Sequence, residues 1–138
     1  MILLIETVAR RYVCRQNDVD TVGLPAATER DARGRAIVRC QLGPLLDPAD
    51  PPAVGRLHAL TIMLRRRVVE LVVPRVDLLA EPPPIVPLAP FLLARLQLPW
   101  VNGVALLDGQ PVIALDLRRL AADVALGLRL AHAAKDAP

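Results

Sequence analysis

The sequence has few of the residue types on which many functional classes depend. Its 138 residues include no serine, two cysteines, two histidines and only 2% aromatic residues. A platform that stacks nucleic-acid bases needs several aromatic side chains on one surface, so this scarcity argues against such a platform. Cys14 and Cys40 are too few for a disulfide framework, and no cysteine or histidine pair has the spacing of metal ligands. We therefore expect neither a metal nor a cofactor.

Residues suited to catalysis are equally scarce. Nucleophilic catalysis needs a Cys, Ser or Thr beside a base that a third group orients. His58 opens an expected strand, and His132 lies near the end of an expected helix, where a cation suits the helix dipole. Cys14 and Cys40 lie among apolar strand residues, where a small buried side chain is the simpler interpretation. The sequence predicts a protein that is not an enzyme.

The charge is only mildly basic, with 17 cationic against 14 acidic residues and a net charge of +3. The cations are spread along the chain, whereas phosphate binding favours cations gathered at one place. The basic clusters at residues 10–11 and 65–67 fall at expected turns, where solvation explains them. No uncharged run reaches the roughly 20 residues that span a bilayer, and Glu6 interrupts the apolar start too early for a signal peptide. We expect a cytoplasmic protein with no membrane insertion and no nucleic-acid partner.

Hydrophobic residues make up 54% of the chain, which is enough to bury a core. Fourteen prolines against seven glycines point away from a helical bundle, because proline interrupts the hydrogen bonds of a helix. The apolar runs are short and rich in Ile, Val and Leu, which is typical of strands joined by tight turns. From residue 117 onward the apolar residues recur at helical spacing, and Asp116 is placed to cap that helix.

The second half of the chain repeats the pattern of the first. Three segments superpose in order, namely 2–13 on 58–69, 19–22 on 76–79 with one residue inserted, and 33–46 on 108–121. Only the second half has a further apolar strand pattern, at 101–107, which leads into the turn signal Asp108-Gly109. Because internal repeats determine architecture before local propensity does, we predict two similar lobes, of which the first is smaller or incomplete.

These patterns predict one domain over residues 1–138 that is mostly β, with two small barrel-like lobes and a C-terminal helix. The expected parts are lobe one at about 1–46, a proline-rich linker at about 47–56, lobe two at about 57–117 and the helix at about 117–135. A short helix is also expected over residues 90–98.

The stretch PWVNGVALLDGQPVIALDLRRLA, at residues 99–121, resembles the closing strands of CheW-like domains. Upstream, VELVVPRVDLLAEPPPIVPL at residues 69–88 is similar to the strand and Val-Asp segment of that family. The first half resembles the family more weakly, at RYVCRQNDVDTV (11–22) and ARGRAIVRCQL (32–42).

The resemblance implies two interlocked SH3-like β-barrel lobes and a non-enzymatic adaptor of bacterial chemotaxis or related two-component signal transduction. Its implied partners are the regulatory domain of a CheA-like histidine kinase and a methyl-accepting chemoreceptor. The implied binding surfaces are apolar strand surfaces, including the groove between the lobes.

Five residues are the candidate partner-binding positions. By the resemblance, Val19, Val22 and Leu24 lie on the apolar segment that the family uses for contact, and Arg33 matches the arginine of the family's Arg-Gly turn. Trp100, the single tryptophan, either packs structurally or anchors a partner.

Two other functions stay open at this point. One is a basic small-barrel module that binds RNA or DNA, which steep salt dependence of binding would reveal. The other is a divergent CheW-like protein that only self-associates, for example as a homodimer. The mean hydropathy of +0.39 agrees with burial against a partner or against a second copy.

Overall fold

The computed structural model describes residues 1–91 and 99–127. Most of the short helix expected at 90–98, and the part of the expected C-terminal helix beyond residue 127, lie outside the described residues. Among the described residues, none of the helices is long and apolar enough to cross a membrane.

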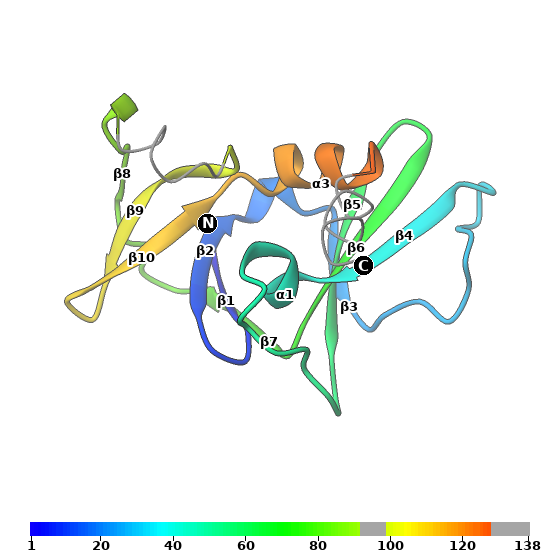
Figure 1. Ribbon diagram of the computed structural model, residues 1–138, viewed down its shortest axis with the longest axis horizontal. Coiled ribbons are helices and arrows are strands. Elements are labelled where there is room, and N and C mark those ends of the chain that lie inside the picture. The colour runs from blue at the N-terminus through cyan, green and yellow to red at the C-terminus, as the bar shows by residue number, and fades with distance from the viewer. Residues whose placement is uncertain (92–98, 128–138) are drawn as a thin grey trace, which may run out of the picture.

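Within the described residues, ten strands form two sheets, so the predicted mostly β fold is confirmed (Figure 1). The six-stranded sheet has the order β7 (Arg75–Leu79), β1 (Ile2–Glu6), β2 (Arg11–Arg15), β10 (Gln110–Leu115), β9 (Val101–Leu107), β8 (Ile85–Val86). The four-stranded sheet has the order β3 (Thr21–Gly23), β5 (His58–Met63), β6 (Arg67–Val73), β4 (Ala36–Gln41). The helical elements are η1 (Gln16–Asp18), α1 (Leu42–Leu46) and α3 (Leu117–Ala125).

Both sheets are built by one pairing scheme around a hairpin. In the six-stranded sheet, β7 pairs antiparallel with β1 and β10 pairs parallel with β2. In the four-stranded sheet, β3 pairs antiparallel with β5 and β4 pairs parallel with β6. The hairpin of each half of the chain is therefore completed by strands from the other half. The repeated scheme agrees with the internal duplication that the sequence predicts.

This exchange corrects the predicted lobe boundaries. A lobe at residues 1–46 and another at 57–117 would keep β1 to β4 together, but β1 and β2 lie in one sheet and β3 and β4 in the other. The prediction is wrong because it assumed that each repeat folds on itself. The segment between α1 and β5 contains no strand or helix, which agrees with its many prolines.

The observed strand pairing also shows that the predicted superposition of the two repeats is displaced by one residue at β1 and β5 and at β3 and β7. Val22 lies opposite Leu60, and Leu78 lies opposite Leu3. Leu3 and Leu60 are both buried in the same core, so they are equivalent, whereas the predicted superposition placed Leu3 on Ala59. A shift of one residue moves a strand side chain to the opposite face, so only the corrected superposition preserves the core. Val22 and Leu78 therefore occupy equivalent positions in the two sheets.

The two sheets differ in size, with six strands in one and four in the other. Strand β9 pairs antiparallel with β10 through a turn at Asp108 and Gly109, whose φ angles of 53° and 75° are those of the tight hairpin turn that Asp-Gly favours. In the four-stranded sheet, β4 takes the place that β10 has in the six-stranded sheet, but no strand follows it at the edge. Among the described residues, only a bridge from Arg30 to Ala36 continues the pairing there.

The core lies between the two sheets, under α3 (Figure 1). In β1, Leu3 and Ile5 enter this main core, whereas Ile2 and Leu4 enter a smaller core inside the curled six-stranded sheet. Strand β1 is thus buried on both faces, because successive side chains of a strand point to opposite sides.

Helix α3 closes the main core with one apolar stripe. Leu117, Leu120 and Val124 recur at helical spacing and are buried. The Asp116 side chain accepts a hydrogen bond from the backbone N–H of Arg119, so the predicted cap is confirmed. The helix ends at Ala125, just before Gly127, whose φ of 101° suits a glycine that terminates a helix.

Replacing Leu120 with Ala should lower the free energy of unfolding by about 2–5 kcal/mol, because the truncation leaves a cavity between the sheets. Urea unfolding followed by circular dichroism measures the change. Leu126→Ala is the matched control, since Leu126 directly follows α3 and is 87% exposed, and it should change stability by less than about 0.5 kcal/mol. A Leu120→Ala protein as stable as the wild type would contradict the burial of this helix.

Candidate functional site

The predicted partner-binding residues lie in three separate places. Val22 and Leu24, at and just after β3, are 46% and 73% exposed, and Val19 beneath them is buried in the main core. Arg33 is exposed in the loop before β4. Trp100 is buried beside β9 and α3. The structure thus brings only Val19, Val22 and Leu24 together.

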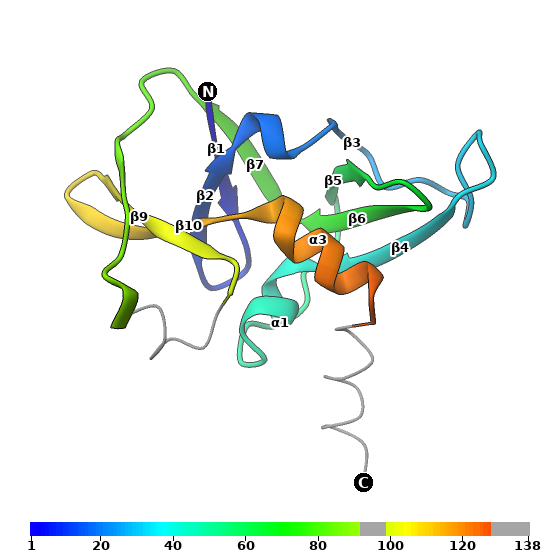
Figure 2. The same cartoon turned by 90° about the horizontal axis from the view of Figure 1, so that it is seen from above.

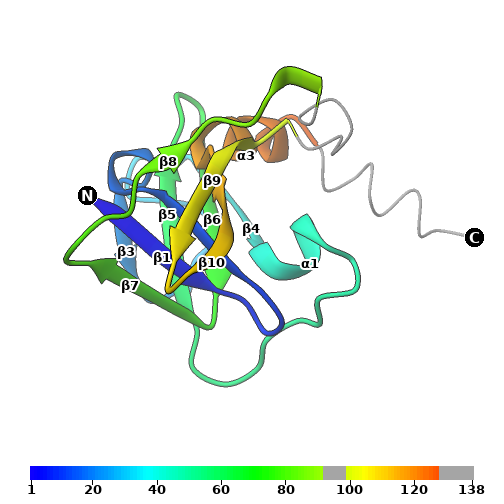
Figure 3. The same ribbon diagram turned by 90° about the vertical axis from the view of Figure 1, so that its left-hand side faces the viewer.

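Strand β3 forms one edge of the four-stranded sheet and β7 forms one edge of the six-stranded sheet. Both lie on the same side of the molecule, where the two sheets meet (Figures 2 and 3). Leu78 on β7 is 51% exposed and occupies the position equivalent to Val22. We call Val22, Leu24 and Leu78 the seam surface. Leu78 was missed in the sequence because the superposition of the repeats was displaced, and correcting that displacement by one residue identifies it.

The start of β3 is fixed by Asp20. Its backbone N–H donates to the carbonyl oxygen of Thr61 at 2.9 Å, and its carboxylate accepts from the backbone N–H of Met63 at 2.6 Å. The same carboxylate lies 3.7 Å from the guanidinium of Arg118 on α3. This strand is therefore tied to the neighbouring strand and to the helix at once.

The loop after β3 is fixed by a buried carboxylate. Glu70 on β6 accepts from the backbone N–H of Ala26 at 3.1 Å and pairs with the Arg39 guanidinium at 2.8 Å. Arg39 in turn donates to the carbonyl oxygen of Ala26 at 2.7 Å. The chain is therefore fixed at Asp20, before Leu24, and at Ala26, after it, while the Leu24 side chain itself is exposed.

The seam surface can bind apolar groups but offers no reactive group. In the described part of the chain, β3 and β7 each have a paired neighbour on one side only. An edge strand leaves backbone N–H and C=O groups for a further partner, and exposed apolar side chains on a folded protein mark sites of association. The exposed apolar side chains and the unpaired strand edges make this surface chemically suited to contact with another polypeptide.

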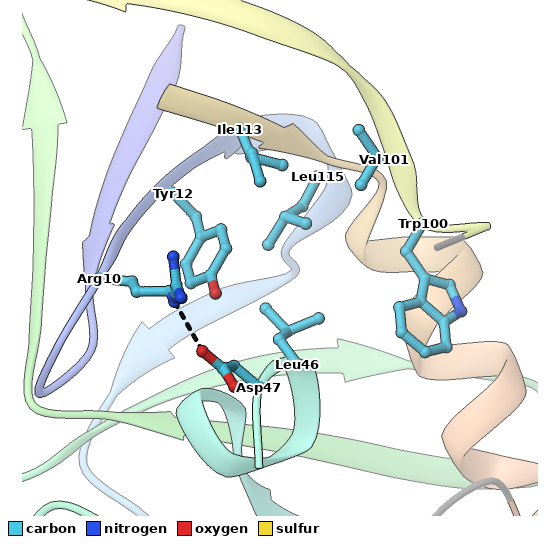
Figure 4. Close-up of a pocket in the computed structure, with 8 residues that line it drawn as sticks. All are labelled: Arg10, Tyr12, Leu46, Asp47, Trp100, Val101, Ile113 and Leu115. Atoms are coloured by element: carbon cyan, nitrogen blue, oxygen red, sulfur yellow. Dashed lines mark hydrogen bonds and ion pairs between the residues drawn. The ribbon is translucent and has the colours of Figure 1, made fainter. Parts of the chain in front are cut away.

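Trp100 lines a cavity of about 140 Å³ between the six-stranded sheet and α1 (Figure 4). The residues around it are Arg10, Tyr12, Leu46, Asp47, Trp100, Val101, Ile113 and Leu115. The Trp100 indole N–H donates to the Asp123 carboxylate on α3 at 2.7 Å, and the Arg10–Asp47 ion pair at 2.7 Å lies at the edge of the cavity. These contacts fix the indole between β9 and α3.

Two aspartates of the proline-rich linker, close to this cavity, form hydrogen bonds that fix the linker. The buried Asp50 accepts hydrogen bonds from the Thr7 hydroxyl and from the backbone N–H of Ala9, which ties the proline-rich linker to the β1–β2 turn. Hydrogen bonds from the Ala49 backbone N–H and the Arg10 guanidinium lower the pKa of Asp47. The sequence alone placed these aspartates in a linker and gave no sign that one of them is buried.

Burial in the main core raises the pKa of Cys14 to about 12, and the nearby Asp18 carboxylate adds to the rise. The thiol is therefore protonated at neutral pH, and a protonated thiol is neither a nucleophile nor a metal ligand. Within residues 1–91 and 99–127, no group of three or more metal-ligating side chains lies close enough together to hold a metal ion.

The sequence matches no protein-family model and no curated protein. The fold, however, is similar to that of a solved structure, the scaffolding protein TtCheW from Thermoanaerobacter tengcongensis. The TM-score is 0.56 with 16% sequence identity, and the likeness covers 86% of this chain and 85% of that chain. The chain therefore has a CheW-like fold of two interlocked β lobes, as the sequence resemblance implied.

Cys14 should resist alkylation in the folded protein. In a Cys40→Ala variant, which leaves Cys14 as the single thiol, iodoacetamide at pH 8 should modify the protein only after unfolding in guanidinium. Because folding raises the pKa, the neutral thiol favours the folded state fully below the unfolded pKa of about 8.5, and this contribution is lost as the pH rises toward 12. Mass spectrometry counts the modified thiols, and rapid alkylation of the folded variant at pH 8 would contradict the burial.

Proposed function

We propose that this protein is a non-enzymatic adaptor of bacterial chemotaxis or a related two-component pathway, acting in the cytoplasm through its seam surface. The observation that carries the proposal is the combination of a CheW-like fold with exposed apolar side chains on both edge strands of the seam. A solved protein with a similar fold is a scaffolding protein, which supports a scaffold role here.

The proposed partners are the regulatory domain of a CheA-like histidine kinase and the cytoplasmic tip of a methyl-accepting chemoreceptor. Val22, Leu24 and Leu78 form the contact, and Val19 supports them from the core. A partner element that lies across the seam buries side chains from both lobes. Burying a Val or Leu side chain contributes about 1.5–3 kcal/mol, so three such residues are enough to dominate a small interface.

Arg33 and Trp100 have different places in this proposal. Arg33 lies in an exposed loop away from the seam surface, where it serves as a second and separate contact. Trp100 is held by Asp123 beside a cavity, so it contributes to binding by supporting the lobe.

Val22→Asp and Leu78→Asp should each weaken binding of the kinase regulatory domain or the receptor tip at least tenfold, because each places a charge in an apolar contact. Isothermal titration calorimetry against the kinases and chemoreceptors encoded in the same genome measures this effect. The matched control is Leu106→Asp, because Leu106 is an exposed leucine on β9 away from the seam, and its binding should stay within twofold of the wild type.

Two results would contradict the proposal. One is unchanged affinity in both seam variants, which would move the contact elsewhere. The other is a wild-type protein that binds none of these partners but forms a concentration-dependent dimer, which Val22→Asp disrupts. Light scattering over a concentration series detects that dimer and would favour self-association as the function.

A further inference from the structure

Arginines that lie far apart in the sequence meet at one end of the four-stranded sheet. The loop before β4 and the β5–β6 turn lie side by side at this end (Figures 1 and 2). Arg30 bridges to Ala36, which in turn pairs with Arg67. The Arg35 guanidinium donates to the carbonyl oxygen of Leu64 at 3.1 Å, which fastens the loop to the turn.

This end of the protein, here called the arginine end, carries a large share of the positive charge. Its arginines are Arg30, Arg33, Arg35, Arg65, Arg66 and Arg67. The carboxylates of the same loop are Glu29 and Asp31, and the Asp20 carboxylate, which accepts from the Met63 N–H just before the turn, is paired with Arg118 on α3. The six arginines and the two carboxylates of the loop give a formal charge of +4, which exceeds the +3 of the whole chain. The cations that appear spread out in the sequence are thus concentrated in the fold.

Three of these arginines are occupied in shaping the surface. The Arg35 guanidinium pairs with Asp31 at 2.7 Å. Arg30 and Arg67 donate to the carbonyl oxygens of Gly34 and Ala125, each at 2.7 Å. These bonds fix the loop, the turn and the end of α3 against one another.

The other three arginines are available to a ligand. Arg33, Arg65 and Arg66 are exposed, and within the described residues none of them has an ion pair. A shallow hollow of about 380 Å³ lies between the same loop and β4, and its lining includes Arg30 and Glu29 but none of these three arginines. The arginine end therefore presents three guanidinium groups without an ion pair on its loop and turn.

We propose that the arginine end binds an acidic segment of a partner protein, separately from the seam surface. The guanidinium group matches a carboxylate through two parallel N–H···O bonds, which a lysine cannot reproduce, and every cation here is an arginine. Tyr12 and Trp100 are buried elsewhere, so they provide no base-stacking surface at this end. An acidic peptide segment matches the charge of these guanidinium groups.

The test uses the full chain and a fluorescein-labelled peptide of eight glutamates, with fluorescence anisotropy in 50 mM NaCl. The double variant Arg65→Glu/Arg66→Glu should bind at least tenfold more weakly than the wild type. Arg15→Glu/Arg56→Glu is the matched control, because it makes the same charge change at exposed arginines away from this end, and it should stay within threefold. A peptide of eight glutamines should not bind.

Circular dichroism melts confirm that both double variants fold. The seam variants Val22→Asp and Leu78→Asp should bind the glutamate peptide within threefold of the wild type, so the two surfaces are tested separately. Equal losses in Arg65→Glu/Arg66→Glu and in the control would overturn the proposal, because the attraction would then follow net charge alone.

The proposal would also be overturned by a stronger ligand of another class. The comparison probes are vesicles of phosphatidylcholine with 30% phosphatidylglycerol and a 20-base-pair DNA duplex. If either binds more than tenfold tighter than the glutamate peptide and loses that binding in Arg65→Glu/Arg66→Glu, the arginine end recognises phosphate groups. Binding of the wild type that persists unchanged at 300 mM NaCl would equally contradict an ionic contact.

Discussion

Each hairpin of this protein is completed by strands from the opposite half of the chain, and the rest of the structure depends on this exchange. β7 and β10 complete the β1–β2 hairpin, while β3 and β4 complete the β5–β6 hairpin. Neither half can satisfy the backbone hydrogen bonds of its own sheet, so the two lobes stabilise each other. The exchange also places the edge strands β3 and β7 on one side, where the seam surface forms.

The sequence allowed the local features to be predicted, because those are encoded by neighbouring residues. The Asp108-Gly109 turn, the Asp116 cap and the apolar stripe of α3 all follow from short-range patterns, and the structure has them. The sheet membership of each strand could not be predicted, because the pairing of β3 with β5 or of β7 with β1 depends on contacts distant in the sequence. The superposition was one residue out because both Leu3 and Ala59 are apolar, and apolar letters alone do not say which face a side chain occupies.

The same distinction holds for the surfaces. Val22 and Leu24 followed from a family resemblance, but Leu78 required the correct register of β7. The arginine end could not be predicted from the sequence, because Arg30 and Arg67 are distant in the chain. They come together only through the bridge from Arg30 to Ala36 and the parallel pairing of β4 with β6. An apolar seam and a basic end are thus presented by different parts of one fold.

The exchange of strands has a consequence for a chain of half this length. A molecule with a single copy of the repeat would have one hairpin and two further strands that cannot pair with that hairpin. It would have to complete its hairpin with the corresponding strands of a second molecule. Such a half-length chain is expected to assemble as a strand-swapped pair with twofold symmetry. Joining the two copies through the linker that Asp50 fastens to the β1–β2 turn turns that pair into one polypeptide, in which the copies are free to diverge. The unequal sheets of six and four strands are a divergence that a symmetric pair does not permit.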